Sequence, residues 1–166
     1  MRRASRLTFV VALLVGVVAF LLTASVATAS VEGAAVPSPA IVKVAFNKKL
    51  KKSILVDGRG LTLYLFTLDL HGKPTCTNDP TYHCSKAWPA LRTKGAPHAG
   101  KGVKQSLLGV AKRTDGGVQV TYKGHPLYFY VGGLGPLPDK KPGDVNGQNF
   151  IGSWFVVSPQ GTAIRF

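Results

Sequence analysis

The sequence of 166 residues is poor in acidic residues, and above all in glutamate. Seven Asp and Glu residues stand against 21 Lys and Arg, the formal net charge is +14, and Glu32 is the single glutamate. A helical bundle stabilised by Glu–Lys pairs is therefore not expected. The hydrophobic fraction of 45% is too high for a disordered chain, and 19 Gly and 11 Pro favour short strands and tight turns. This length supports one domain with a targeting segment.

The sequence also lacks the signatures of common enzyme classes. It contains no G-x-S-x-G, no H-E-x-x-H, no P-loop and no complete dinucleotide fingerprint. No glutamate follows residue 41 and the six Asp residues are scattered, so a carboxylate pair for glycoside hydrolysis has no support. We therefore expect a protein that is not an enzyme, with an envelope hydrolase as a remote alternative.

The N-terminus has the layout of an export signal. A start with three arginines precedes the apolar run 7–22, and small residues with an A-x-A pattern follow up to residue 29. We predict a signal peptide over residues 1–29 and a flexible spacer over residues 30–40, which contains two prolines. An uncleaved membrane anchor is the alternative, because residues 7–29 could span a bilayer.

Cleavage of the predicted signal peptide would lower the net charge of the protein. Removal of the three N-terminal arginines leaves 18 Lys and Arg against 7 acidic residues, or +11. No cysteine lies near the predicted cleavage point, so a lipid-modified cysteine cannot hold the mature chain there. The predicted location is extracellular or in the cell envelope.

The folded part is predicted to be all-β. Short apolar alternations separated by turn signals predict about eight short antiparallel strands and at most one short helical turn, within 85–91. The expected strands are 41–46, 54–56, 61–67, 107–113, 118–122, 126–131, 153–157 and 162–166.

An internal repeat is the second expectation for the domain 41–166. The segment from Gly60 to Tyr64 aligns with the segment from Gly124 to Tyr128, and each is followed by a long loop and a tryptophan. We predict two diverged copies, about 41–91 and 107–157, because a unit of three strands buries too little surface to be stable alone.

These motifs resemble a family of bacterial secreted and lipoprotein repeats. The family is defined by a Tyr-x-x-x-x-Asp motif, which appears here as Tyr64, Phe66 and Asp69. The motifs that agree in order are LVDGRGLTLYLFTLD, the Cys pair with Ala87-Trp88-Pro89, GHPLY at 124–128, PGDVNGQ at 142–148 and SWFVVSP at 153–159. The resemblance implies a secreted protein of repeat architecture, and it supplies no catalytic residues because the family has no established activity.

The sequence departs from the family pattern in three ways. After Tyr128, Gly133 stands where the first copy has Asp69, so the second motif is incomplete. The two cysteines are farther apart than is usual in the family. The lipid-attachment cysteine of many members is absent.

Cys76 and Cys84 are expected to form a disulfide, as is usual in an exported protein. Closing this short loop would stabilise the fold by about 2–3 kcal/mol. The alternative is a site for copper or zinc, or a redox site, formed by His71, Cys76, His83 and Cys84. Their spacing fits no standard zinc pattern, and no cofactor is predicted.

Tyr64 and Asp69 are five residues apart, which places them on opposite faces of a regular strand. If Asp69 lies beyond the strand end, its carboxylate can cap a loop or accept a hydrogen bond from a tyrosine hydroxyl. A structural role is the main interpretation, and a role in ligand binding is the alternative.

Two polar segments complete the set of candidates. Asp139, Asp144, Asn146 and Gln148 lie in a loop that either forms a simple Gly-Asp turn or binds calcium, although the acids of a calcium loop are incomplete. The basic stretch of Lys48, Lys49, Lys51 and Lys52 is either a solvated hairpin turn or a contact for anionic polymers or lipid head groups.

We therefore predict an exported β-repeat module, of the cell envelope or secreted, that acts in binding or structure. Its partner is an unknown envelope ligand or protein, including an anionic surface polymer, and nucleic acid is disfavoured by export and by the lack of a recognition helix. The alternative is an extracytoplasmic metal-binding or redox protein that uses the Cys/His loop.

Overall fold

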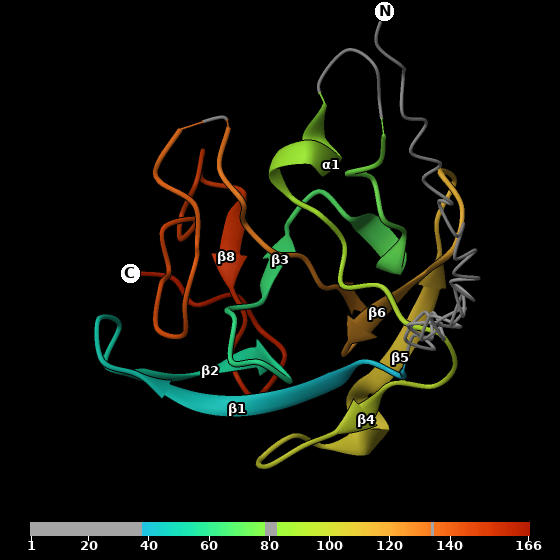
Figure 1. Ribbon diagram of the computed structural model, residues 1–166, viewed down its shortest axis with the longest axis horizontal. Helices are drawn as coiled ribbons and strands as arrows, with labels where there is room; N and C mark the ends of the chain where they lie inside the picture. Colours follow the sequence, from blue (N-terminus) through green and yellow to red (C-terminus); the bar gives the residue numbers. More distant parts are fainter. Residues whose placement is uncertain (1–37, 79–82, 134) are drawn as a thin grey trace, which may run out of the picture. The chain divides into compact units, whose positions relative to one another are not determined.

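The computed structural model describes residues 38–78, 83–133 and 135–166, in which eight strands form three small sheets (Figure 1). The strands are β1 (Ile41–Asn47), β2 (Lys52–Asp57), β3 (Tyr64–Phe66), β4 (His98–Ala99), β5 (Leu108–Lys112), β6 (Val118–Tyr122), β7 (His125–Pro126) and β8 (Trp154–Val156). The all-β prediction is confirmed. Among these residues no helix has the length and apolar character needed to cross a membrane. The predicted signal peptide and most of the predicted spacer lie outside the described residues.

The sheets have the strand orders β2-β1-β4, β3-β8 and β5-β6-β7. Every paired strand is antiparallel except β4, which runs parallel to β1 over the pairs Ile41–His98 and Val42–Ala99. The expectation of antiparallel strands therefore does not extend to β4. Strands β2 and β3 lie between β1 and β4 in the chain, so no hairpin turn connects β1 to β4. An antiparallel direction is therefore not imposed on this pair.

The predicted turns depend on a few backbone requirements. One carboxylate oxygen of Asp57 accepts hydrogen bonds from the amides of Arg59 and Leu61, both at 2.9 Å, which closes the turn after β2. Gly116 and Gly117, between β5 and β6, have φ of 88° and 78°. The amide of Gly116 donates to the carbonyl of Arg113 at 3.3 Å, which closes the turn, and the two glycines take the left-handed conformation without steric cost.

Two hydrophobic cores lie on opposite faces of the central strands. Alternate residues of β8 enter different cores, with Trp154 and Val156 on one side and Phe155 on the other. The aromatic core consists of Ile54, Val56, Tyr64, Cys76, Ala87, Trp88, Tyr128, Tyr130, Val145, Trp154, Val156 and Ile164. The second core consists of Val42, Leu55, Leu63, Leu65, Leu91, Val120, Tyr122, Leu127, Phe155 and Val157. Burial on both faces explains why these strands are almost continuously apolar.

Several predicted strands are shorter in the structure. The expected strand 61–67 reduces to β3, and the expected strand 126–131 shares only Pro126 with β7, because these extended segments change hydrogen-bonding partners every two or three residues. Leu127, for example, donates to Val120, and Phe129 donates to Pro89. The expected strand 162–166 is represented by one bridge, from Ala163 to Val157.

The helical content is small, as expected. Helix α1 (Cys84–Ala87) overlaps the predicted helical turn at 85–91. The structure adds two 3₁₀ turns that the sequence did not indicate, η1 (Leu70–Gly72) and η2 (Gln105–Leu107). The turn η1 directly follows Asp69 and begins the loop that leads to Cys76.

Candidate functional site

The two motif tyrosines lie side by side at the centre of the fold. The amide of Tyr64 donates to the carbonyl of Tyr128, and the amide of Tyr128 donates to the carbonyl of Tyr64, both at 2.9 Å. This closed pair of hydrogen bonds is an isolated antiparallel bridge. It joins the predicted first repeat directly to the predicted second repeat.

The hydroxyl of Tyr128 reaches the motif aspartate of the other segment. Tyr128 Oη donates to Asp69 Oδ2 at 2.7 Å, and both groups are buried. The second carboxylate oxygen of Asp69 accepts the amide and the hydroxyl of Thr75, each at 2.7 Å. Asp69 therefore lies past the end of β3, where it orders the following loop and accepts a tyrosine hydroxyl.

The hydroxyl of Tyr64 makes the corresponding contact with an aspartate far along the chain. Tyr64 Oη donates to Asp139 Oδ2 at 2.5 Å, and Asp139 Oδ1 accepts the amide of Asn146 at 2.8 Å. The amide of Gly147 also donates to Tyr64 Oη, at 3.3 Å. Tyr64 and Asp69, which the motif places together in sequence, are therefore not hydrogen-bonding partners.

Asp139 plays for Tyr64 the part that Asp69 plays for Tyr128, although the second motif lacks an acid at Gly133. Gly133, at the position of the motif acid, is exposed with φ of 99°, and Asp139 supplies the carboxylate six residues later. The sequence did contain a signal for this residue. Asp139 is the first acid after Tyr128, just as Asp69 is the first acid after Tyr64. Fixed motif spacing concealed it, because the loop after Tyr128 is longer.

The electrostatics of these pairs keep both tyrosine hydroxyls protonated, as hydrogen-bond donors must be. Burial, reinforced by the negative charge of Asp139, raises the pKa of the Tyr64 hydroxyl far above its ordinary value. Burial and the charge of Asp69 raise the pKa of Tyr128 in the same way. Burial also raises the pKa of Asp69 and Asp139, although the hydrogen bonds that each accepts oppose this shift. Both tyrosines consequently keep their protons and act as donors at neutral pH.

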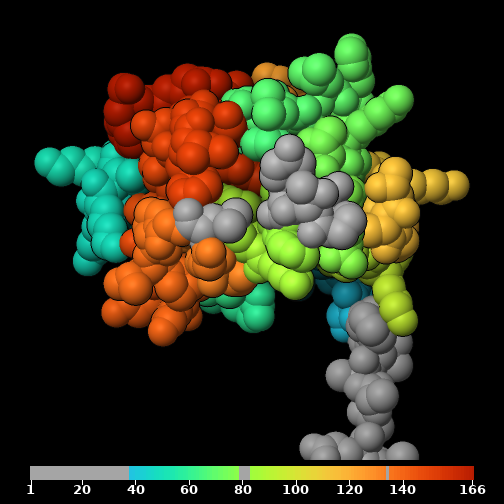
Figure 2. Space-filling view, turned by 90° about the horizontal axis from the view of Figure 1, so that it is seen from above, coloured from blue at the N-terminus to red at the C-terminus, as the bar shows by residue number. Residues whose placement is uncertain are grey.

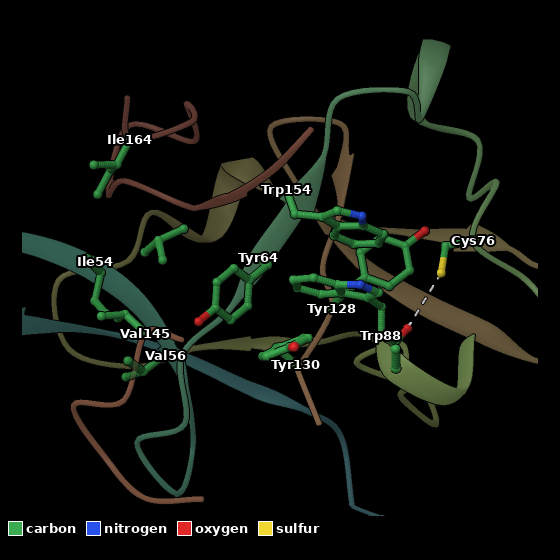
Figure 3. Close-up of a cluster of buried hydrophobic side chains, with 12 residues drawn as sticks. Ile54, Val56, Tyr64, Cys76, Trp88, Tyr128, Tyr130, Val145, Trp154 and Ile164 are labelled. Atoms are coloured by element: carbon green, nitrogen blue, oxygen red, sulfur yellow. Dashed lines mark hydrogen bonds between the residues drawn. The ribbon is translucent and has the colours of Figure 1, made fainter. Parts of the chain in front are cut away.

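A stack of four aromatic rings runs beside the two pairs, and Figure 3 shows three of them, Trp154, Trp88 and Tyr130. The rings of Trp88 and Trp154 lie 3.9 Å apart and are nearly parallel, at 5°. Phe66 stacks on the outer face of Trp154 at 4.2 Å, and Tyr130 packs on Trp88 at 4.4 Å. The stack alternates between the two predicted repeats, since Phe66 and Trp88 come from the first and the other two rings from the second.

Each motif tyrosine meets the stack edge-on. Tyr64 contacts Trp88 at 5.4 Å and 77°, and Tyr128 contacts Trp154 at 5.1 Å and 87°. Edge-to-face geometry is a favoured arrangement of aromatic rings. The two tryptophans that the sequence places at similar distances after the tyrosines therefore occupy equivalent positions around them.

Cys76 and Cys84 form the predicted disulfide, with an S–S distance of 2.06 Å. Cys76 is only 1% exposed and belongs to the aromatic core, whereas His71 and His83 are exposed. The bond ties the loop after β3 to α1, the helix that leads into Trp88. Within residues 38–78, 83–133 and 135–166, no three His, Cys, Asp or Glu side chains form a group able to hold a metal ion.

The oxygen atoms proposed for calcium are directed at protein donors. Asp144 Oδ2 accepts the amides of Lys140 and Lys141, at 3.1 and 3.2 Å. Gln148 Oε1 accepts the amide of Val156 at 2.8 Å. This geometry supports the simpler interpretation of a Gly-Asp turn, with Asp144 organising the loop 140–144.

The four candidate lysines do not form one surface. Lys48 and Lys49 line a groove of about 550 Å³ between the β1–β2 hairpin and the loop 141–144. Lys52 lines a separate hollow with residues 158–165, and Lys51 lines neither. In Figure 2 the hairpin turn, coloured teal, stands out at the left edge, with the orange segment around residue 140 close by.

Comparison with known proteins identifies the second half of the chain. Residues 109–158 match a family described as a secreted repeat of unknown function. The matched segment is similar to this secreted repeat over 50 residues. It contains Tyr128, Asp139 and Trp154, and it confirms the family resemblance and the prediction of an exported protein. No curated protein and no solved structure is detectably similar to the chain.

Proposed function

We propose that the protein is a binding module of the cell envelope without catalytic activity, built from two copies of one β-unit. The observation that carries this proposal is the reciprocal pairing of Tyr128 with Asp69 and of Tyr64 with Asp139. The residues that define the motif are buried and satisfy one another. Their role in this proposal is to join the two units, which leaves ligand contacts to the surface.

Charge supports binding to an anionic envelope component. Each of the five described aspartates is held by hydrogen bonds within the protein; they are Asp57, Asp69, Asp115, Asp139 and Asp144. By contrast, 14 lysines occur in the sequence, and the ion pair of Lys49 with Asp144 is the one lysine pair among the described residues. Among the described residues the aspartates pair with this lysine and with three arginines, so most of the lysine charge is not neutralised by an ion pair there.

Cosedimentation with isolated cell envelopes tests the proposal. The purified mature protein should sediment with envelopes of its native host, and the Tyr128→Phe variant should do so equally at a temperature where it is folded. Equal binding by Tyr128→Phe would agree with the proposal that the buried motif joins the two units and does not contact the ligand.

Two results would overturn the proposal. One is a wild-type protein that stays in the supernatant with every envelope fraction. The other is turnover of envelope material that Asp69→Asn abolishes without changing the folded fraction, because the motif would then be catalytic.

A further inference from the structure

We infer that the groove between the β1–β2 hairpin and the loop 141–144, here called the hairpin groove, binds a segment of an anionic polysaccharide. This inference rests on the proposed function and assigns a site and a ligand class to it. Three observations support it: the charge of the groove walls, an exposed aromatic ring at the groove, and the fixed position of both walls.

The walls of the hairpin groove carry an excess of positive charge. Lys48 and Lys49 line it from the hairpin, and Lys141 lines it from the loop. Asp144 is the single acid among the lining residues, so the charge is three minus one, or +2. Lys49 Nζ lies 3.8 Å from Asp144 Oδ1, and its side chain remains 60% exposed. A pair this exposed is weak, so Lys49 remains available to an anionic ligand.

Phe46 adds an aromatic surface to these charges. Its side chain lines the groove and is 66% exposed, although it lies within β1. The groove also has an apolar lining from Ala45, Ile54 and Val56. An exposed aromatic face beside cations suits a ligand that carries both anionic groups and apolar ring faces, as the sugar rings of an acidic polysaccharide do.

The two walls are held in place by buried polar side chains. Asn47 is 2% exposed; its Nδ2 donates to the carbonyl of Gly143 at 3.1 Å, and its Oδ1 accepts the amide of Leu50 at 2.9 Å. The hydroxyl of Thr62, which is also buried, donates to the carbonyl of Asp144 at 2.6 Å. A preformed groove loses less conformational entropy on binding than a flexible surface would.

The shape favours a polymer segment over a lipid surface. The lysines lie on both sides of a hollow of about 550 Å³, which is large enough to enclose part of a chain. A bilayer presents its anionic head groups as a broad surface and would engage outward-facing lysines on the turn rather than the lining of a groove.

The test compares the binding of the mature protein to dextran sulfate and to neutral dextran, measured by calorimetry at low salt. Wild type should bind dextran sulfate and not neutral dextran. The variant K48Q/K49Q/K141Q should bind dextran sulfate about tenfold or more weakly, because surface lysines contribute through screened electrostatic attraction. The matched control K73Q/K86Q/K112Q removes the same charge from exposed lysines outside the groove and should bind within about twofold of wild type.

Phe46→Ala separates ring contacts from charge. It should weaken binding of dextran sulfate and leave binding of linear polyphosphate, which has no sugar ring, unchanged. Near-ultraviolet circular dichroism of each variant verifies the fold, and all substituted side chains are exposed.

Several outcomes would overturn the inference. They are equal losses in the two triple variants, an unchanged affinity of K48Q/K49Q/K141Q, and a groove dependence seen with anionic phospholipid vesicles but not with dextran sulfate. If the groove variant still sediments with envelopes as wild type does, the site is wrong and the proposed function stands. If wild type itself does not sediment, the proposed function fails.

Discussion

At the scale of single residues, the two Tyr–Asp pairs decide how the halves of the chain are joined. Each tyrosine hydroxyl is buried and donates to a carboxylate that the other half supplies. Each carboxylate also fixes its own loop, through Thr75 for Asp69 and through Asn146 for Asp139. Loss of one hydroxyl therefore leaves a buried carboxylate short of a donor, which costs more than the hydrogen bond alone.

Double-mutant cycles will identify the true partners. Tyr128→Phe combined with Asp69→Asn should show a coupling energy of about 1–2 kcal/mol in urea unfolding, because the two groups are in contact. The cycle of Tyr64→Phe with Asp69→Asn, which links residues of one motif that do not pair, should be additive within about 0.5 kcal/mol. Coupling within the motif, with none across it, would refute the crossed pairing.

The same carboxylates predict how stability depends on pH. Burial raises the folded-state pKa of Asp69 and Asp139 above the ordinary aspartate value of about 4. Their contribution to stability is thus complete below that ordinary pKa and is lost as the pH rises through the raised values. Relative to the variant D69N/D139N, the free energy of unfolding of wild type should fall as pH rises above about 4.

Urea unfolding between pH 3 and pH 8 measures this difference. The matched control is Asp115→Asn, since hydrogen bonds from Arg113 lower the pKa of Asp115 and its contribution is instead lost as the pH falls. Parallel stability curves for wild type and D69N/D139N would contradict the prediction.

At the scale of elements, the disulfide fixes the entry into the aromatic stack. It joins Cys76, in the core, to Cys84, the first residue of α1. Trp88 directly follows this helix. The variant C76A/C84A should lose about 2–3 kcal/mol of unfolding free energy, because the open loop gains entropy in the unfolded state. Reductant should lower the stability of wild type by a similar amount and leave the variant unchanged. Equal unfolding midpoints for wild type and variant would refute this role.

Element by element, the sequence predicted local features better than pairings. The Asp57 and Gly116 turns, helix α1 and the disulfide each depend on residues close together in the chain. Strand β4 could not be predicted, because two residues carry no periodicity and their partner is β1, more than fifty residues earlier. The pairing of Asp139 with Tyr64 was missed because Asp139 follows Tyr128 by eleven residues instead of the five of the motif.

The sequence also could not predict that the four candidate lysines lie on different parts of the surface. Lys49 and Lys52 are three residues apart, yet they line different hollows because the chain reverses direction between β1 and β2. The sequence did not indicate Lys141 or Phe46 as candidate binding residues. The structure places both at the same groove.

At the scale of the whole molecule, the motif tyrosine of each half finds its hydrogen-bonding partners in the other half. The backbone and the hydroxyl of Tyr64 bond to the second half, and those of Tyr128 bond to Tyr64 and Asp69 in the first. We therefore predict that fragments 38–106 and 107–166, produced separately, show no cooperative unfolding transition, whereas the chain 38–166 shows one. Circular dichroism and tryptophan fluorescence during urea unfolding measure this. A cooperative transition in either fragment alone would refute it.

The two Tyr–Asp contacts are reciprocal: each half supplies the tyrosine for one contact and the aspartate for the other. Residue i contacting j while j contacts i is the defining property of an isologous, two-fold interface. A chain with one such unit would meet the same requirement by dimerising with itself. Here the two partners belong to one chain and their loops differ: one loop carries a disulfide, and the other makes a longer connection to its acid. The chain resembles a heterodimer in one polypeptide, because a substitution at either tyrosine removes a hydrogen bond from an aspartate of the opposite half.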